Sequence, residues 1–424
     1  MNMRYGIFLL LAAATLAGCA RKAPDSPVTA PQAAAAAAAG GGPLETRPRN
    51  ATDYEPMFPD QTRAPGVVSD IKLDIQVIAR GLVLPWAVEQ LPDRRFLVTE
   101  KPGQLRLLSA DGKTSISVAG VPAVRYNGQA GLLDVALDPA FADNHIIYVC
   151  YSEQREGGSG IALARARLVE AGAAAHLEDV KVVFRAMPTL ESDRQLGSRI
   201  SFGKDGKLYL TLGERGIAEA VGQAQDLRSD FGKVARLNAD GSVPKDNPFV
   251  GRSDALPEIW SYGHRDAQSL AVDSVTGKVW SIEHGPRGGD ELNLIRAGAN
   301  YGWPIICYGI DYSGAKVGAG ITQKEGMEQP VYYWDPVIAP SGMTIYRGTM
   351  FPEWQGSIFV GGLVGMKLVR LQMEGDRVKG EEWFLQDLHA RIRDVQQGVD
   401  GAIYVLTESG PDSLLVRIAR QAGS

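Results

Sequence analysis

A loose repeat runs through the chain and limits the folds that it can adopt. Each copy has an apolar pair, a turn rich in Pro, Gly and Asp, and an alternating strand; the copies start at Ala87, Val135, Ile200, Leu270 and Val395, with a weaker one at Phe351. Such a hairpin cannot bury both of its faces alone, so successive copies must pack on one another. Six copies predict an all-β, six-bladed β-propeller. A pair of β-sandwiches is the alternative, but it does not explain the recurring turn.

Several of the predicted strands run into a glutamate, which we interpret as the point where the strand becomes a loop: Glu100, Glu214, Glu283 and Glu408. In a propeller, the loops at one end of the central channel form a shallow site.

Length and composition leave the domain count open but exclude one class of partner. The 424 residues suffice for one large all-β domain or for two average domains. The hydrophobic share of 45% and the charged share of 22% are ordinary for a globular protein. The net charge of −5 argues against a nucleic acid partner, because phosphate binding requires a basic surface.

The N-terminus has the features of a lipoprotein signal peptide over residues 1–19. Arg4 precedes the short apolar run Ile7–Leu16, which is too short to span a membrane, and the run ends in Leu16-Ala17-Gly18-Cys19. That tetrapeptide resembles a bacterial lipobox, which implies lipidation of Cys19; a plain secretory signal with a chance cysteine is the alternative. We therefore expect a periplasm-facing lipoprotein of the cell envelope, in the outer membrane because Ala20 is not aspartate, with the lipid as its only membrane contact.

Residues 20–65 are rich in Ala, Pro and Gly, which predicts a flexible linker before the propeller domain, residues 66–424. Beyond Cys19 the chain has two cysteines. Cys150 lies in an apolar run and is expected to be a buried, inert thiol. A disulfide with Cys307 is possible in an oxidising compartment, but the sequence does not place the two side by side, and we treat them as unpaired.

The segment Ser261–Pro304 concentrates charged and aromatic residues between glycines. The Gly285-Pro286 and Gly288-Gly289 pairs predict a turn with outward carbonyls, since proline has no N–H and glycine lets a ligand approach the backbone. Carbonyls followed by Asp290-Glu291 are the oxygen ligands that calcium prefers.

This segment, with N-Y-G-W-P at 300–304, resembles the glucose/sorbosone dehydrogenase family, the soluble aldose dehydrogenases that use pyrroloquinoline quinone (PQQ) and calcium. The resemblance covers roughly Ile71 to Ala419. It implies a six-bladed propeller that oxidises small-molecule aldose sugars to lactones with PQQ and Ca²⁺. The sugar and the electron acceptor are not indicated.

The resemblance also implies cofactor-binding residues. Arg265, Arg391 and Arg393 match the family's cofactor-contacting arginines, and Gln129 and Tyr312 match a glutamine and a tyrosine that contact the quinone. Arg391 and Arg393 are two residues apart, so both point to one face of a strand. The alternatives are a solvated strand face for the arginines, a turn residue for Gln129 and a half-buried aromatic for Tyr312.

Calcium ligands follow from the same resemblance. The carbonyls of Gly285 and Pro286 match those that hold the cofactor's ion, and Glu291 and Tyr301 match a second, structural site. A buried Glu291 with no cation would carry a large desolvation cost, so we expect it to be either exposed or paired.

The base position departs from the family pattern. The family's general base is a histidine two residues before a G-x-R turn, and in the segment Asp193–Arg199 that place is occupied by Gln195. Glutamine cannot accept a proton, and the loss of a positioned base lowers a rate by about 10² to 10⁴.

Two further positions differ. Asp266 puts a negative charge where the family has a neutral amide facing an anionic cofactor, and Val364 replaces an expected lysine. Lys367 lies three residues on, and a small misalignment could place it in the loop.

Two hypotheses follow. The first is a PQQ- and calcium-dependent aldose dehydrogenase whose base role has moved to Asp193 or Glu191. The second is a catalytically degenerate propeller that acts as a binding or scaffolding lipoprotein of the envelope.

Overall fold

The computed structural model describes residues 41–423. The predicted signal peptide with Cys19, and residues 20–40 of the predicted linker, lie outside this range. Within it the chain is almost entirely strand and loop. None of its few short helices is long and apolar enough to cross a membrane.

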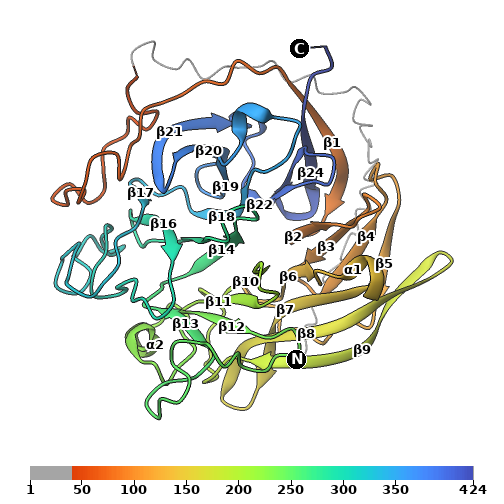
Figure 1. Cartoon of the computed structure of the whole chain (residues 1–424), viewed down its shortest axis with the longest axis horizontal. Coiled ribbons are helices and arrows are strands. Elements are labelled where there is room, and N and C mark those ends of the chain that lie inside the picture. The colour runs from red at the N-terminus through yellow and green to blue at the C-terminus, as the bar shows by residue number, and fades with distance from the viewer. Residues whose placement is uncertain (1–40, 424) are drawn as a thin grey trace, which may run out of the picture.

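The strands form six four-stranded units arranged around a ring (Figure 1). Three of these units are separate sheets, and a fourth sheet pairs β1 with the last three strands of the chain. The remaining two units are joined into one eight-stranded sheet by the parallel pairing of β5 with β9. The prediction of an all-β, six-bladed propeller is therefore confirmed.

The first three blades contain the following strands. Blade 1 has β2 (Pro85–Gln90), β3 (Phe96–Glu100), β4 (Gln104–Leu108) and β5 (Ser115–Ala119). Blade 2 has β6 (Leu132–Leu137), β7 (Ile146–Arg155), β8 (Gly158–Ala171) and β9 (Ala174–Arg185). Blade 3 has β10 (Gly197–Phe202), β11 (Leu208–Leu212), β12 (Lys233–Leu237) and β13 (Ile259–Tyr262).

The other three blades complete the ring. Blade 4 has β14 (Ala267–Val272), β15 (Val279–Glu283), β16 (Asp290–Ile295) and β17 (Tyr332–Trp334). Blade 5 has β18 (Pro340–Ile345), β19 (Ile358–Gly362), β20 (Lys367–Glu374) and β21 (Arg377–Phe384). Blade 6 has β22 (Ile392–Gln397), β23 (Ile403–Thr407), β24 (Ser413–Arg420) and β1 (Leu73–Leu82). The short helices are α1 (Phe141–Asn144), α2 (Ala218–Val221), η1 (Gly222–Gln225), η2 (Pro352–Trp354), η3 (Gln386–Leu388) and η4 (Gly410–Asp412).

The ring is closed by the pairing of β1 with β24, which completes blade 6 with a strand from the other end of the domain. The first strand of each blade contacts the first strand of the next, so β2, β6, β10, β14, β18 and β22 surround the central channel. No blade can therefore shift without disturbing its two neighbours.

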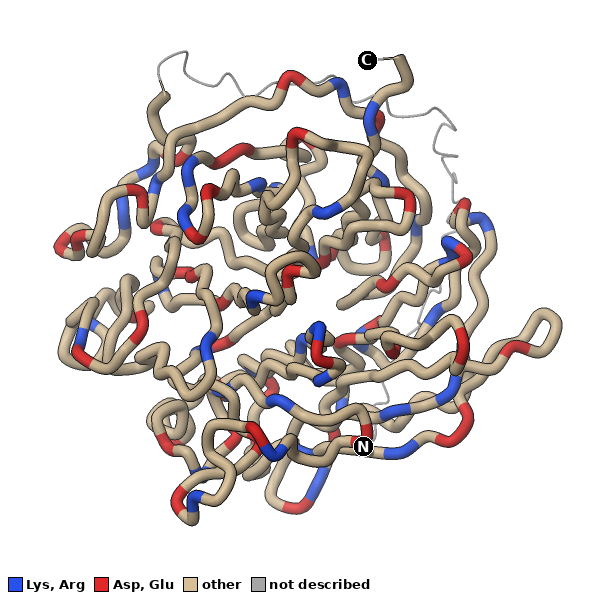
Figure 2. The backbone as a smooth tube through the Cα atoms, in the orientation of Figure 1, with Lys and Arg blue, Asp and Glu red and all other residues tan. Residues whose placement is uncertain are grey.

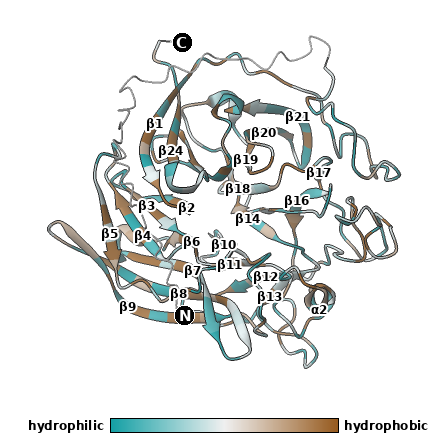
Figure 3. Cartoon of the chain, turned by 180° about the vertical axis from the view of Figure 1, so that it is seen from behind, coloured by the Kyte–Doolittle hydropathy of each residue, from teal (hydrophilic) through white to brown (hydrophobic). Residues whose placement is uncertain are grey.

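The hydrophobic core lies between neighbouring blades. One cluster joins Trp280 and Leu292 of blade 4 to Val360 of blade 5, and another joins Phe96 of blade 1 to Leu406 of blade 6. Figure 3 shows hydrophobic residues mainly along the strands. Acidic and basic residues are spread around the whole rim, with neither sign gathered on one side (Figure 2).

The predicted flexible linker is wrong for residues 43–65. This segment, with the two residues that follow it (residues 43–67, called the strap below), is packed against blades 4 and 5. Gln61 and Ala64 are 0% and 1% exposed, and the main chain of Val67 donates to the carbonyl of Glu381. Composition suggested disorder, but a few residues of the segment supply specific contacts with these blades.

Both cysteines of the described region are free, as we expected, and both are buried, which we had predicted for Cys150 alone. Burial raises the pKa of the Cys150 thiol far above its usual value and that of Cys307 to about 12. Neither thiol is therefore ionised at neutral pH.

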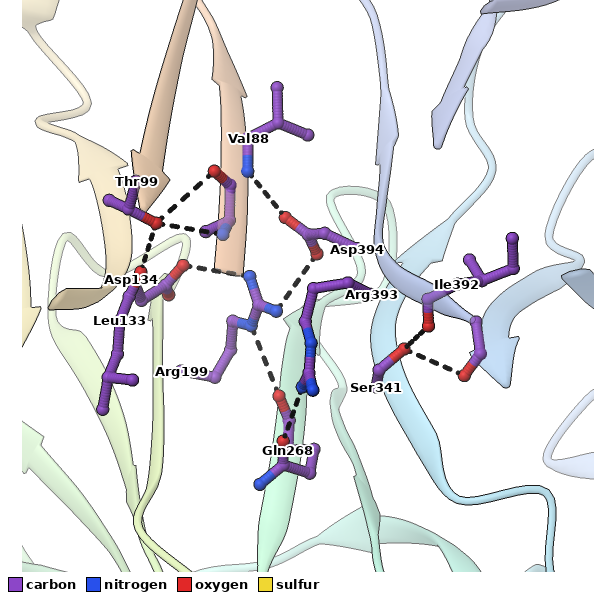
Figure 4. Close-up of polar contacts among 12 residues, drawn as sticks. Val88, Thr99, Leu133, Asp134, Arg199, Gln268, Ser341, Ile392, Arg393 and Asp394 are labelled. Atoms are coloured by element: carbon purple, nitrogen blue, oxygen red, sulfur yellow. Dashed lines mark hydrogen bonds and ion pairs between the residues drawn. The ribbon is translucent and has the colours of Figure 1, made fainter. Parts of the chain in front are cut away.

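A single arginine connects four other blades at the centre of the ring (Figure 4). Arg199 of β10 pairs with Asp134 of β6 at 2.9 Å and with Asp394 of β22 at 3.0 Å. Its Nε donates to the carbonyl of Gln268 in β14 at 3.4 Å, and its guanidinium lies 4.5 Å from the ring centroid of Trp86 in β2.

The carboxylates around Arg199 outnumber it. Burial raises the pKa of Asp134 to about 7, although Arg199 opposes the shift. Burial, together with the charges of Asp134 and Asp394, raises the pKa of the neighbouring Glu89 to about 8. Without Arg199, three acidic groups would face one another on the axis of the propeller.

We expect Arg199→Met to lower the free energy of unfolding by about 3 to 5 kcal/mol, because it leaves buried carboxylates without their cation. Urea unfolding at pH 7 measures the loss. Arg167→Met is the control: Arg167 forms an exposed pair with Glu178, so its removal should leave the midpoint nearly unchanged. Equal losses in the two variants would contradict the central role of Arg199.

Candidate active site

The predicted site residues converge on one mouth of the channel. Gln129 lies in the β5–β6 loop, Gln195 in the β9–β10 loop and Arg265 in the β13–β14 loop, whereas the turn 284–289 joins β15 to β16. Arg391 immediately precedes β22. In blades of antiparallel strands, the start of the first strand and the end of the second lie at the same end, which brings these segments together.

Each inner strand contains an irregularity near this mouth. The register with the second strand shifts at the same place in every blade, between Pro85/Ala87, Leu132/Val135, Gly197/Ile200, Ala267/Ser269, Pro340/Met343 and Ile392/Asp394. Such bulges redirect side chains. In β22 the consecutive residues Arg393 and Asp394 both reach the channel, where they contact Gln268 and Arg199 (Figure 4).

Three cations surround one carboxylate at the mouth. Glu408 accepts hydrogen bonds from Lys101 Nζ at 3.1 Å and from Arg393 Nε at 2.6 Å. The Arg391 guanidinium lies close enough to influence Glu408 electrostatically, but it makes no hydrogen bond or ion pair within residues 41–423. Burial alone would raise the pKa of Glu408, but Arg393, Lys101 and Arg391 hold it at about 2. This part of the site therefore carries an excess of positive charge.

The contacts continue from blade 6 to blades 4 and 3. Arg393 Nη1 donates to Gln268 Oε1 at 3.4 Å, and Gln268 Nε2 donates to Asp266 Oδ1 at 3.0 Å. The same Asp266 oxygen accepts the Gly197 N–H at 3.1 Å. Asp266 thus holds the loop of Gln195 against the loop of Arg265.

The negative charge of Asp266 is compensated inside the protein. Its Oδ2 lies 3.2 Å from His284 Nδ1, and the residue is fully buried. Burial would raise the pKa of Asp266, but His284, with Arg265 nearby, brings it below its usual value. Asp266 is therefore a partner of His284 rather than an unpaired charge facing a ligand.

Gln195 and Gln129 contact each other. The Gln195 main-chain N–H donates to Gln129 Oε1 at 2.7 Å, and Gln195 Oε1 is buried with no hydrogen-bond partner within residues 41–423. The site's two histidines cannot supply the missing base. His264 is buried between Ser261 Oγ (2.8 Å) and Glu283 Oε1 (3.0 Å), and His284 Nε2 lies 2.7 Å from a backbone carbonyl.

Lys367 does not occupy the loop of Val364. It begins β20, and its Nζ lies 3.0 Å from the ring centroid of Trp383. Burial there lowers the pKa of Lys367 to about 8. The loop itself presents the exposed side chain of Val364, so the realignment that would place Lys367 there is not supported.

Arg265 lies in a small pocket beside the predicted metal turn. Its Nη1 donates to the carbonyls of Gly285 at 2.9 Å and His284 at 3.2 Å, and its guanidinium lies 5.2 Å from the ring centroid of Trp303. The pocket is lined by Arg265, Glu283, His284, Gly285, Gly289, Glu291, Tyr301, Trp303, Ile306 and Cys307.

The same pocket gathers oxygen atoms. Glu291 is paired in register with Glu283, and Asn293 Nδ2 donates to both carboxylates, at 3.1 and 2.9 Å. Burial and the Glu283 charge raise the pKa of Glu291 well above its usual value. Asn293 Oδ1 is buried without a partner among the described residues. The Tyr301 hydroxyl is bonded to the main chain of Leu294, so only its backbone carbonyl could bind a cation.

These oxygens come from few acidic side chains. Within residues 41–423, no group of three or more His, Cys, Asp or Glu side chains could hold a metal ion. A cation here would depend on backbone carbonyls together with Glu291. Such a ligand set suits calcium rather than a transition metal.

Tyr312 stands apart from the other predicted residues. It is 70% exposed in the turn 311–315 and does not line the pocket. Its role as a cofactor contact remains a prediction. Conversely, Lys101 and Gln268 take part in the polar contacts at the mouth, although we did not predict either residue from the sequence. Glu408 was predicted only as the end of a strand.

These features define a class of protein: a six-bladed propeller with a cation-rich polar site at one mouth of its channel. The glucose/sorbosone dehydrogenase family model matches residues 82–417, so the chain belongs to that family of sugar oxidoreductases. Aldose sugar dehydrogenase YliI of Escherichia coli (strain K12) is 40% identical over 346 residues, which cover 81% of this chain and 92% of that protein.

Solved structures agree with this assignment. The apo-form crystal structure of the soluble aldose sugar dehydrogenase from Escherichia coli is 39% identical, with a TM-score of 0.78, and it covers 82% of this chain and 100% of that one. The PQQ-bound aldose sugar dehydrogenase from Streptomyces coelicolor is 28% identical, with a TM-score of 0.67, over 83% of this chain and 100% of that one.

We expect Glu408→Gln to destabilise the protein at neutral pH and much less in acid. The Glu408 pKa of about 2 is depressed, so its contribution is present above the unfolded pKa of about 4.5 and is lost as the pH falls toward 2. The shift corresponds to about 3 kcal/mol at pH 7. Urea unfolding of both proteins at pH 7 and pH 3.5 measures it, and a loss that does not shrink at the lower pH would contradict the charge cluster.

Proposed function

We propose that this chain oxidises aldose sugars to lactones with PQQ and Ca²⁺ in the cell envelope. The excess positive charge of Lys101, Arg391 and Arg393 around Glu408 is the observation that carries the proposal. PQQ has three carboxylates, and a site for it requires cations that the protein has not already neutralised. The natural electron acceptor is unknown.

Unpartnered donors and acceptors support the fit of both groups. Arg265 Nε and Trp303 Nε1 are buried without hydrogen-bond partners among residues 41–423, and an acceptor-rich quinone would satisfy them. Beside Arg265, whose Nη1 contacts the Gly285 carbonyl, the carbonyls of Gly285 and Pro286 would meet the cofactor's calcium. Glu291 and the Tyr301 carbonyl would meet the second ion, with Asn293 Oδ1 as an additional oxygen.

The position of Asp193 makes it the best replacement for the missing base. A Cβ added to Gly128 would lie 2.3 Å from Asp193 Oδ2, so the carboxylate rests against the loop that carries Gln129. The Gln129 N–H also donates to the Asp193 carbonyl at 3.2 Å. The Asp193 carboxylate makes no hydrogen bond or ion pair within residues 41–423, so no other side chain occupies the oxygens that a sugar hydroxyl would contact.

The other two nearby acids are less suitable. Glu191 is paired with Arg125 at 2.5 Å, and its side chain is 66% exposed. Glu214 is 1% exposed, so a sugar hydroxyl cannot reach it, even though burial raises its pKa to about 7.

In the proposed reaction, Asp193 takes the proton of the sugar's C1 hydroxyl. Bound PQQ would supply the two-electron acceptor for the C1 hydride, and the C1–O bond would then become the carbonyl of the lactone. Gln129 accepts the Gln195 main-chain N–H and so joins its own loop to the loop that carries Asp193. Arg265, Arg391 and Arg393 would orient the cofactor through its anionic groups.

One observation favours a second function. Gln195 replaces the base that the family uses, so a propeller that no longer catalyses, and instead binds or scaffolds at the envelope, is the alternative. Both proposed functions include attachment to the membrane through lipid on Cys19, as the sequence motif predicts.

We expect Asp193→Asn to lower kcat by about 10² or more while KM changes little, because only proton transfer is lost. Dye-coupled oxidation of a panel of aldoses, with PQQ and calcium added, measures both constants. Gln195→His should raise the activity of wild type and of Asp193→Asn by at least about tenfold. Glu191→Gln is the matched control and should be near wild type. Full activity of Asp193→Asn would refute this base, and no activity in any variant would favour the degenerate propeller.

We expect calcium to stabilise the fold. An ion that binds only the native state adds about 2.7 kcal/mol at a hundredfold excess over Kd. Thermal melts with calcium and with chelator should therefore differ by several degrees in wild type. Glu291→Gln should lose this difference, whereas the exposed control Glu374→Gln should keep it. Identical wild-type melts would show that no stabilising calcium binds.

A further inference from the structure

The strap contacts the predicted metal turn although it lies outside the family region. The family model begins at residue 82, whereas the strap comprises residues 43–67. Its route passes from the turn 284–289 along β17 to β21. The strap therefore precedes the residues that the family model matches, and it packs directly behind a part of the common site.

Asp335 joins the strap to blade 4. Its Oδ1 accepts the Asn50 main-chain N–H at 2.8 Å and Asn50 Nδ2 at 2.9 Å, and its Oδ2 accepts the Ala51 N–H at 2.9 Å. Asp335 is 2% exposed. A buried carboxylate that loses a hydrogen-bond donor is left unsatisfied, which is costly. Because three donors to Asp335 come from the strap, this carboxylate holds the strap strongly.

The same two residues contact the turn. Asn50 Oδ1 accepts from Arg287 Nε at 3.1 Å. Gly288 has a φ of 86°, and a Cβ added there would lie 2.7 Å from Asp335 Oδ1, so the turn packs its backbone directly on this carboxylate. The Gly289 N–H donates to the Trp334 carbonyl at 2.9 Å. The outer side of the turn is thus supported by Asn50 and Asp335, while His284, Gly285 and Gly289 line the pocket.

A second anchor keeps the strap in place. Gln61 Nε2 donates to the Pro330 carbonyl at 2.9 Å, and its main-chain carbonyl accepts the Tyr333 N–H at 2.8 Å. Arg63 Nη2 donates to the Asp335 carbonyl at 2.9 Å. The strap is therefore also fixed on the C-terminal side of Asn50, which limits how far Asn50 and the turn can move apart.

We propose that Asn50 and Asp335 are positioning residues for the turn Gly285–Gly289, so that the order of this turn depends on the strap. The consequence for calcium rests on the proposed function, because the carbonyls of Gly285 and Pro286 are the predicted ligands. Without the strap, the turn would keep its sequence but lose its outer support. Its carbonyls would then be ordered only when an ion binds, at a cost to affinity.

Hydrogen exchange of the metal-free full chain tests the proposal directly. Loss of the Asn50 hydrogen bonds should speed exchange in the peptide that covers the turn by about three- to tenfold in Asn50→Ala, with blade 1 peptides unchanged. Asn50→Asp should have a larger effect, since it places a second carboxylate against Asp335. Thr52→Ala is the matched control in the same segment, because Thr52 is exposed and its hydroxyl contacts only Asp53.

Calcium titration of the same proteins separates this proposal from the proposed function. If wild type binds calcium, Asn50→Ala should bind it at least about threefold more weakly, and Thr52→Ala should bind it normally. If wild type binds no calcium, the assignment of the turn as a metal site fails. The hydrogen-exchange result alone then tests whether the strap orders the turn. An Asn50→Ala protein whose strap exchanges faster while the turn keeps wild-type exchange would overturn the proposal.

Discussion

The ring depends on Arg199, whose side chain contacts four other blades. It forms ion pairs with Asp134 and Asp394, donates to the Gln268 carbonyl and stacks on Trp86 (Figure 4). Asp394 also accepts the Val88 N–H, so the network closes between the last blade and the first. A buried pair of this kind gives little net stability by itself, but the removal of one partner is costly. Its effect is to fix the mutual positions of the inner strands.

The candidate site lies on the same inner strands, next to the Arg199 network and nearer the mouth of the channel. Because of the bulge in β22, Asp394 faces Arg199 while Arg393 faces Gln268 and Glu408. The structural network and the proposed cofactor site are therefore connected through consecutive residues. This connection explains how a site assembled from several blades can hold its cations in place before any ligand binds. It also leaves the base position, in a loop at the edge, free to change without loss of the fold.

The fold could be predicted because five repeat copies fall on inner strands. The sixth, at Phe351, starts instead in the loop before β19, because the inner strand β18 lacks the recurring turn. The arginines and the metal turn could be recognised from local motifs. Lys101 and Gln268 could not, since each acts through partners distant in sequence. The packed strap was missed because composition does not reveal specific contacts such as those of Asn50 with Asp335.

We expect the site to keep its affinity for the cofactor although the family's base is absent. An equilibrium titration of the purified metal-free protein with PQQ, with and without calcium, measures this affinity, because binding needs no base. One PQQ per chain should bind saturably, more tightly with calcium and more weakly in Arg393→Ala. Absence of binding at high micromolar PQQ with calcium present, in a protein that is folded, would contradict it.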